Sequence, residues 1–180
     1  MTDRYVILDR DGTINIDSDA FIKSPEEWLP IPGSLEAIAL LNRHGYKVVV
    51  ISNQSGIARG LLDLAALEAI HAKMRQLTKA AGGDIKAIYF CPHGPNDACA
   101  CRKPKDGLFR RFAADTQTDL SQTYSVGDSL RDIQASESAG AKAILVRTGK
   151  GEKTLLNHPQ LNVPIFDNLY EAATHIVSKS

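Results

Sequence analysis

The sequence predicts an α/β protein built on a doubly wound, mostly parallel sheet, and two observations support this fold. Short runs rich in Val and Ile alternate with segments of helical periodicity along the whole chain. The runs also lack the polar alternation of a sheet with one solvated face, as expected of parallel strands buried on both sides. The expected strands span residues 5–8, 47–52, 85–90, 123–126, 143–147 and 163–166. The expected helices span residues 33–44, 63–80, 106–116, 130–139 and 168–177.

Several helix ends and one helix face can be placed within this scheme. Three helices are followed by glycines that suit a left-handed C-cap: Gly45, Gly82 and Gly140. The helix over 63–80 carries apolar residues at three- and four-residue steps, which we expect to face the sheet: Leu64, Leu67, Ile70, Met74 and Leu77. On the same helix we expect Met74 in the core and His71 at its flank, both with structural roles.

Length and composition limit the classes of protein. A chain of 180 residues, 43% of them hydrophobic, predicts a single domain over residues 1–180 with a substantial core. The 21 basic residues equal the 21 acidic ones, so no basic excess favours a nucleic-acid or anionic-membrane partner. The sequence shows neither a membrane-spanning apolar stretch nor a signal peptide, and we expect a cytoplasmic location.

The first expected strand ends in two acids, Asp9 and Asp11, followed by Gly12. The carboxyl ends of the strands form the ligand-binding edge of an open α/β sheet. Two carboxylates this close repel each other, so a cation is expected between or beside them. The alternative is an ordinary polar turn, in which Asp and Gly are common.

Two further polar segments are expected near the same edge. The second strand closes with Ser52-Asn53-Gln54-Ser55-Gly56, where a hydroxyl and backbone amides can donate hydrogen bonds to phosphate oxygens. Arg102 and Lys103 precede the third helix, and Arg suits bidentate phosphate contacts whereas Lys acts as a compact charge. Taken alone, the first segment also fits a plain turn and the second a solvated surface pair.

The fourth expected strand delivers another carboxylate, Asp128, to this edge. Asp128 beside Asp9 and Asp11 would form an oxygen-rich cluster suited to Mg²⁺. Asp132 follows one helical turn later and could orient that cluster from behind. Together, the four segments predict a metal-dependent site that binds phosphate.

All three cysteines fall within a segment of eleven residues that also contains a histidine. The four candidate ligands are Cys91, His93, Cys99 and Cys101. Three thiolates and one imidazole form a regular set for structural zinc. An odd cysteine count argues against a disulfide framework, and no neighbouring base and acid favour a catalytic thiol. A structural Zn²⁺ is therefore expected, holding the loop that precedes Arg102 and Lys103.

These four segments, in this order, resemble the haloacid dehalogenase superfamily of phosphohydrolases over nearly the whole chain. The resemblance implies a Rossmann-like fold in which Asp9 attacks phosphorus and becomes a transient aspartyl phosphate. Asp11 would protonate the leaving alkoxide and then deprotonate water. Mg²⁺ would bind the carboxylates of Asp9 and Asp128 and the main-chain carbonyl of Asp11. Ser52 and Lys103 would hold the remaining phosphoryl oxygens.

The chain leaves little room for a large cap domain, which predicts a relatively open, capless site. A capless phosphatase with Cys-x-His, Cys-x-Cys and then Arg-Lys-Pro resembles the heptose bisphosphate and histidinol phosphatase family. The segments 53–60 and 146–151 are similar to its heptose branch. That likeness implies loss of the 7-phosphate from D-glycero-D-manno-heptose 1,7-bisphosphate, on the way to the nucleotide-activated heptose of the lipopolysaccharide core.

The resemblance also implies contacts with this phosphorylated sugar, and the protein is expected to act as a monomer. The implied substrate contacts are Asp17, Ser18, Asp19, Ala20, Asn53, Gln54, Ser55, Arg102 and Ser129, with Arg102 on the distal phosphate. Two segments depart from the commoner pattern. Many relatives have a Gly-Tyr pair in the loop over 17–21, and some have Lys in place of Ser129.

Two other functions stay open from the sequence. A histidinol-phosphate phosphatase would use the same chemistry on another alcohol, although that branch usually has Asp in place of Ser55. A non-enzymatic, zinc-bearing binding module is disfavoured because Asp9, Asp11, Lys103 and Asp128 are all present.

Overall fold

A computed structural model describes residues 2–180 and contains one six-stranded sheet in which every neighbouring pair is parallel. The order across the sheet is β3-β2-β1-β4-β5-β6. The strands are β1 (Arg4–Leu8), β2 (Tyr46–Asn53), β3 (Ile85–Cys91), β4 (Tyr124–Gly127), β5 (Lys142–Val146) and β6 (Ile165–Phe166). The predicted fold class and all six strands are confirmed, with ends that differ by one or two residues.

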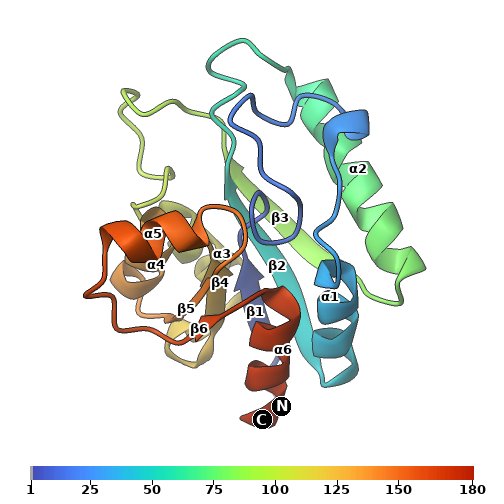
Figure 1. Ribbon diagram of the computed structural model, residues 1–180, viewed down its shortest axis with the longest axis vertical. Coiled ribbons are helices and arrows are strands. Elements are labelled where there is room, and N and C mark those ends of the chain that lie inside the picture. The colour runs from blue at the N-terminus through green and yellow to red at the C-terminus, as the bar shows by residue number, and fades with distance from the viewer. Residues whose placement is uncertain (1) are drawn as a thin grey trace.

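Helices cover both faces of this sheet (Figure 1). One face packs against α1 (Ser34–Arg43), α2 (Leu64–Ala80) and α6 (Leu169–Ser178), and the other against α3 (Gly107–Thr116), α4 (Leu130–Ser138) and α5 (Gly151–Asn157). Two short 3₁₀ helices are η1 (Pro25–Glu27) and η2 (Leu120–Gln122). Alternate residues of the central strands point to opposite faces of the sheet and pack into two separate cores. Val48 and Val50 face α2, whereas Val49 and Ile51 face α3.

Three details differ from the sequence-based expectations. Leu64 is 53% exposed because it is the first residue of α2, and the buried stripe begins one turn later at Leu67. The last strand begins at Ile165 rather than Val163, since Pro164 has no N–H to donate to the sheet. The short helix α5 was not expected. The three expected C-cap glycines are confirmed, each with a positive φ of 82–89°.

The sheet topology determines where ligands can bind. The chain runs outward from β1 through β2 to β3, and then returns to place β4 on the other side of β1. Ligands of such sheets bind at the carboxyl ends of the strands beside this reversal. Within residues 2–180, no helix is both long and apolar enough to cross a membrane.

Candidate active site

Lys103 connects three parts of the sheet edge. Its side chain is almost fully buried, and its Nζ donates to Asp9 Oδ1 at 3.0 Å and to the Ile51 carbonyl at 2.8 Å. The same ammonium lies 2.7 Å from Asp132 Oδ1. Burial alone would lower the pKa of Lys103, but Asp132 and Asp9 outweigh it and raise that pKa above its ordinary value. The ammonium therefore stays charged.

The carboxylates around Lys103 carry more negative charge than the buried cations balance. Four carboxylates form the group: Asp9, Asp11, Asp128 and Asp132. Among residues 2–180, the buried Lys and Arg side chains are those of Arg10 and Lys103. Burial and the neighbouring Asp132 raise the pKa of Asp9 to about 7, and burial and Asp9 raise the pKa of Asp128 well above its ordinary value. A divalent cation would balance the excess.

The geometry of the cluster fits such a cation. Asp9, Asp128 and Asp132 each offer an oxygen atom within 4.8 Å of the others. Asp132 is already occupied, since Oδ1 pairs with Lys103 and Oδ2 accepts the backbone N–H groups of Asp128 and Ser129. This leaves Asp9 and Asp128 as carboxylate ligands, the pair implied by the sequence resemblance. Oxygen donors of this kind suit Mg²⁺.

Two glycines leave room for the Asp128 carboxylate, because a Cβ on either would collide with it. A Cβ at Gly12 would lie 2.0 Å from Asp128 Oδ2, and one at Gly149 would lie 2.2 Å from the same oxygen. Gly12 also has φ +86°, a conformation that costs other residues free energy. The Asp128 carboxylate is further fixed by the backbone N–H of Lys150, which donates to Oδ2 at 2.8 Å.

The Asp11 carboxylate accepts five hydrogen bonds from four donor nitrogen atoms. Arg10 donates from Nε and Nη2 to Asp11 Oδ1 at 3.0 and 2.9 Å, and from Nη2 to Oδ2 at 3.2 Å. Asn15 donates to Oδ1 at 2.9 Å and Gln54 to Oδ2 at 3.1 Å. Burial would raise the pKa of Asp11, but the Arg10 guanidinium and these hydrogen bonds hold it below the ordinary value.

Three residues expected to touch the phosphorylated ligand use their polar groups within the protein. Ser52 does not line the cavity, and its Oγ accepts a hydrogen bond from Gln54 Nε2 at 2.7 Å. Asn53 pairs both amide groups with the backbone of Lys103, at 3.1 and 3.0 Å. Ser129 caps α4 and donates to Asp132 Oδ2 at 2.9 Å. Asn53 and Ser129 still border the cavity.

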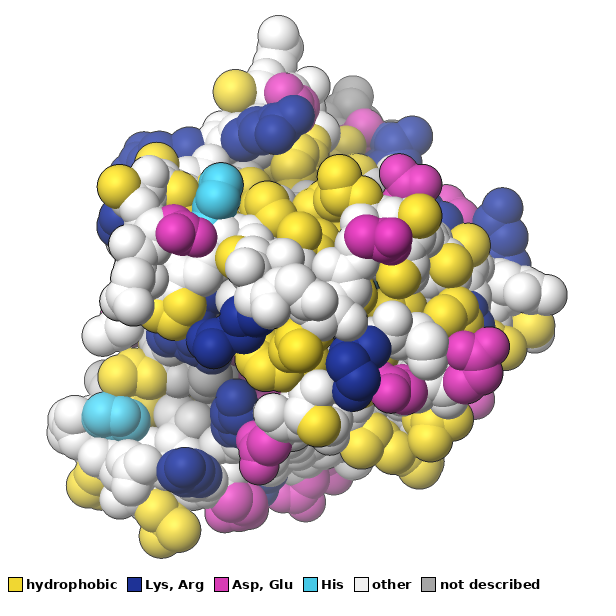
Figure 2. Space-filling model, turned by 90° about the horizontal axis from the view of Figure 1, so that it is seen from above, with side chains coloured by type: hydrophobic (Ala, Val, Ile, Leu, Met, Phe, Trp, Pro, Cys, Tyr) yellow, Lys and Arg dark blue, Asp and Glu magenta, His cyan; other side chains and the backbone are white. Residues whose placement is uncertain are grey.

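The cluster opens into a cavity of about 160 Å³ at the strand ends. The sequence-predicted residues on its wall are Asp9, Asp11, Asp17, Ser18, Asp19, Asn53, Gln54, Ser55, Arg102, Lys103, Asp128 and Ser129. Ala20 is exposed and does not line it. Figure 2 looks onto this edge and shows Lys and Arg side chains gathered around a hollow.

Three guanidinium groups lie near the mouth of the cavity. Arg102 and Arg131 line the cavity. Burial and the positive charges of Arg131 and Arg59 lower the pKa of Arg102. Within residues 2–180, none of the three forms an ion pair with a carboxylate. Like charges held together without acidic partners indicate a binding site for an anion.

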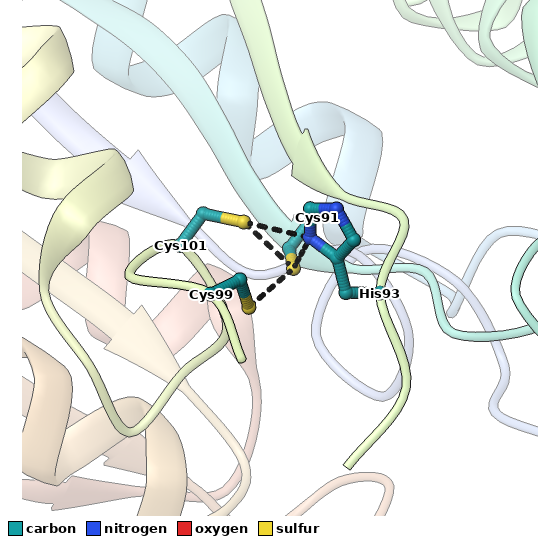
Figure 3. A group of neighbouring side chains, drawn as sticks. All are labelled: Cys91, His93, Cys99 and Cys101. Carbon is teal, nitrogen blue, oxygen red and sulfur yellow. Dashed lines mark hydrogen bonds between the residues drawn. The ribbon is translucent and has the colours of Figure 1, made fainter. Parts of the chain in front are cut away.

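The predicted zinc ligands meet in one cluster, drawn in Figure 3. Cys91 ends β3, while His93, Cys99 and Cys101 come from the loop that follows. The distances from Cys91 Sγ to His93 Nδ1, Cys99 Sγ and Cys101 Sγ are 3.4, 3.8 and 2.9 Å. Tetrahedral zinc with Zn–S bonds of ~2.3 Å places its donors roughly 3.5–3.8 Å apart. The first two distances are close to this range and the third is shorter, and all four donor atoms lie within 4.8 Å of one another. The cluster fits a zinc site.

Comparison with known proteins agrees with this architecture. Residues 100–172 match a family described as HAD-hydrolase-like. The D-glycero-beta-D-manno-heptose-1,7-bisphosphate 7-phosphatase of Pseudomonas putida is 50% identical, over 97% of this chain and 99% of that protein. The enzyme of the same name from Bordetella bronchiseptica is 55% identical, over 84% of this chain and 85% of that protein. A crystal structure of the D,D-heptose 1,7-bisphosphate phosphatase from B. bronchiseptica, complexed with magnesium and phosphate, superimposes with a TM-score of 0.95. That structure shares 48% identity and covers 98% of this chain and 99% of its own.

The parallel sheet and the carboxylate–lysine cluster at its edge define a phosphoric monoester hydrolase with the haloacid dehalogenase fold. Within that class, the chain belongs to the family of D-glycero-D-manno-heptose-1,7-bisphosphate 7-phosphatases.

Sequence reasoning missed several residues that shape the site. Arg10 was not singled out, although a basic residue enclosed by two acids is itself a signal. Thr148 and Lys150 were noted only as part of a family-like segment, yet Thr148 Oγ1 donates to the Gly12 carbonyl at 2.7 Å. The backbone of Lys150 holds Asp128, an interaction that no side-chain motif reveals.

We predict that Gly12→Ala blocks divalent-cation binding, because its Cβ would displace the Asp128 carboxylate. Gly82→Ala is a matched control, since Gly82 has φ +89° and no atom within 4 Å of its ideal Cβ. Both variants should lose stability, by roughly 1–2 kcal/mol. Only Gly12→Ala should also lose the rise in Tm on adding MgCl₂, measured by thermal unfolding. An equal rise in both variants would contradict the cation site.

We predict that Cys99→Ser lowers the zinc content and Tm, and raises KM, because the loop also carries Arg102, whose Nη1 donates to the His93 carbonyl at 3.3 Å. Asn96→Ser changes the same loop without removing a donor and serves as the control. Elemental analysis of purified protein is the measurement. The assignment is wrong if the wild-type protein from zinc-replete medium holds no stoichiometric zinc.

Proposed function

We propose that this protein hydrolyses the 7-phosphate of D-glycero-β-D-manno-heptose 1,7-bisphosphate and so serves the synthesis of nucleotide-activated heptose for lipopolysaccharide. The observation that carries the proposal is Asp9, which lies at the end of β1 with Lys103 on one oxygen and Asp128 beside it. The names of the relatives support the substrate and its β anomer.

In the first step, a carboxylate oxygen of Asp9 attacks phosphorus and the bond from phosphorus to the sugar oxygen breaks. Asp11, which takes a proton from the phosphate monoanion as the substrate binds, gives that proton to the leaving alkoxide. In the second step, water attacks the aspartyl phosphate while Asp11 takes a proton from it. Inorganic phosphate leaves and Asp9 is regenerated. Lys103 is placed to balance charge on the phosphoryl oxygens. Contact of Ser52 with one of these oxygens stays a prediction.

Mg²⁺, held by Asp9, Asp128 and the main-chain carbonyl of Asp11, would supply positive charge that offsets repulsion between the nucleophile and the dianionic phosphate. The relative crystallised with magnesium and phosphate supports this assignment. Zn²⁺ on the Cys₃His cluster is structural in this proposal, because four protein donors leave no open position for chemistry.

The arginines at the mouth suit the second phosphate of a bisphosphate. Arg102 and Arg131 lie on the cavity wall, whereas Lys103 lies deeper, against Asp9. A substrate that reacts at one phosphate would thus present its other phosphate to the guanidinium groups. Asp17, Ser18 and Asp19 lie on the wall where they could contact the sugar. We further propose that the protein is a cytoplasmic monomer. The balanced charge of the chain supports the absence of nucleic-acid and anionic-membrane partners.

The experiment that tests the proposal measures phosphate release from the β and α anomers of the heptose bisphosphate and from histidinol phosphate, with and without Mg²⁺. We expect Mg²⁺-dependent turnover with the highest kcat/KM on the β anomer. Preference for histidinol phosphate would assign the protein to the other branch, and no release from any of the three would contradict a phosphatase.

We predict that Asp9→Asn abolishes turnover, because an amide is a poor nucleophile and removes a charge from the cation site. Asp84→Asn, an exposed substitution of the same type, should leave kcat unchanged. Steady-state phosphate release gives kcat for both. If Asp9→Asn keeps even one tenth of the wild-type kcat, about 1.4 kcal/mol of barrier, nucleophilic catalysis by Asp9 is contradicted.

We predict different effects for the two adjacent cations. Lys103→Ala should depress kcat strongly, since Lys103 contacts Asp9, where charge develops. Arg102→Ala should mainly raise KM for the bisphosphate, about tenfold, and much less for a sugar monophosphate. Arg43→Ala, an exposed substitution on α1, is the control. Equal losses of kcat in the two variants would remove the case for a distal-phosphate site at Arg102.

A further inference from the structure

Arg10 is a fully buried cation that the proposed reaction does not use directly. Its side chain is 0% exposed, directly after the end of β1. Three of its hydrogen bonds go to the Asp11 carboxylate, and Nη1 lies 3.1 Å from Nε2 of His71 on α2. A buried guanidinium is costly unless its donors are paired, so His71 completes the surroundings of Arg10.

The direction of the contact between Arg10 and His71 follows from chemistry. A guanidinium can only donate, so His71 Nε2 accepts and the ring carries its proton on Nδ1. Burial and the charge of Arg10 lower the pKa of His71 to about 3, which agrees with a neutral ring. The sequence predicts a structural role for His71 at the flank of α2, and the structure adds that its Nε2 contacts Arg10, which bonds the Asp11 carboxylate.

The contacts of Asp11 show what this arrangement controls. Oδ1 accepts Arg10 Nε, Arg10 Nη2 and Asn15 Nδ2, all at 2.9–3.0 Å. Oδ2 has longer contacts, at 3.2 Å to Arg10 and 3.1 Å to Gln54, and Gln54 lines the cavity. Rotation of the Arg10 guanidinium would therefore rotate the Asp11 carboxylate and change which oxygen faces the cavity.

We propose that His71 is a positioning residue for proton transfer: it fixes the Arg10 guanidinium and, through it, aims Asp11 Oδ2 at the leaving oxygen of the substrate. This rests on the proposed function, in which Asp11 protonates the leaving alkoxide. His71 itself touches neither substrate nor metal ligand in this proposal.

The test compares an alkyl ester, the heptose bisphosphate, with an aryl ester, 4-nitrophenyl phosphate. A nitrophenolate leaves without a proton donor, whereas an alkoxide requires one. His71→Leu should lower kcat/KM for the heptose bisphosphate about tenfold and kcat/KM for the aryl ester less than about threefold. The ratio kcat/KM reports formation of the aspartyl phosphate and leaves out its hydrolysis, which both esters share. His71→Gln, which restores an acceptor, should recover most of the lost rate.

Met74→Ala is the matched control, because Met74 lies one turn later on the same buried face of α2. It should lower Tm without changing the ratio of the two kcat/KM values. His71→Met provides a second variant without the nitrogen should His71→Leu fail to fold. Equal losses on both esters in the His71 variants would overturn the positioning role.

The Asp11→Asn variant distinguishes failure of the positioning role of His71 from failure of the proposed function. If Asp11→Asn loses far more rate on the alkyl ester but His71→Leu does not, the positioning role fails and the proposed function stands. If Asp11→Asn lowers kcat/KM equally for both esters, the acid role of Asp11 fails first, and the inference fails with it.

Discussion

The ammonium of Lys103 is the interaction on which the rest of the site depends. It bonds Asp9 after β1, Asp132 on α4 and the carbonyl of Ile51 in β2, so one buried cation joins the three elements at the sheet reversal. Removing it would leave two buried carboxylates beside each other without a counter-charge, which is among the costliest changes a protein interior can undergo. Structural and electrostatic roles therefore coincide in this side chain.

The position of Lys103 is itself determined from two sides. Asn53 grips the Lys103 backbone through both of its amide groups, linking the end of β2 to the loop. On the other side, Cys101 belongs to the Cys₃His cluster, which ties the loop to the end of β3. The loop is rich in proline and polar residues and has little core of its own. The Asn53 contacts and the Cys₃His cluster hold it in place instead. Asn53 and the Cys₃His cluster thus both determine where Lys103 meets the carboxylates.

The sequence predicted the sheet, its strand ends and the residues that gather there, because hydrophobic periodicity places strands and the carboxyl ends of parallel strands share one edge. It did not predict which polar groups would pair with each other. Ser52 and Ser129 were both expected to contact the ligand, yet the hydroxyl of Ser52 accepts from Gln54 and that of Ser129 caps α4. Such choices depend on side-chain rotamers and on backbone donors such as that of Lys150, which carry no sequence signal.

Charge balance explains why the cluster tolerates four carboxylates in a partly buried space. Arg10 neutralises Asp11 and Lys103 neutralises Asp132, as the lowered pKa values of both acids indicate. Asp9 and Asp128 remain, and both have raised pKa values because burial and their acidic neighbours disfavour a second negative charge. The four acids thus fall into two that are paired with buried basic side chains and two that would share a cation. A divalent ion between Asp9 and Asp128 would restore the ionised state of Asp9, which is the state that a nucleophile requires.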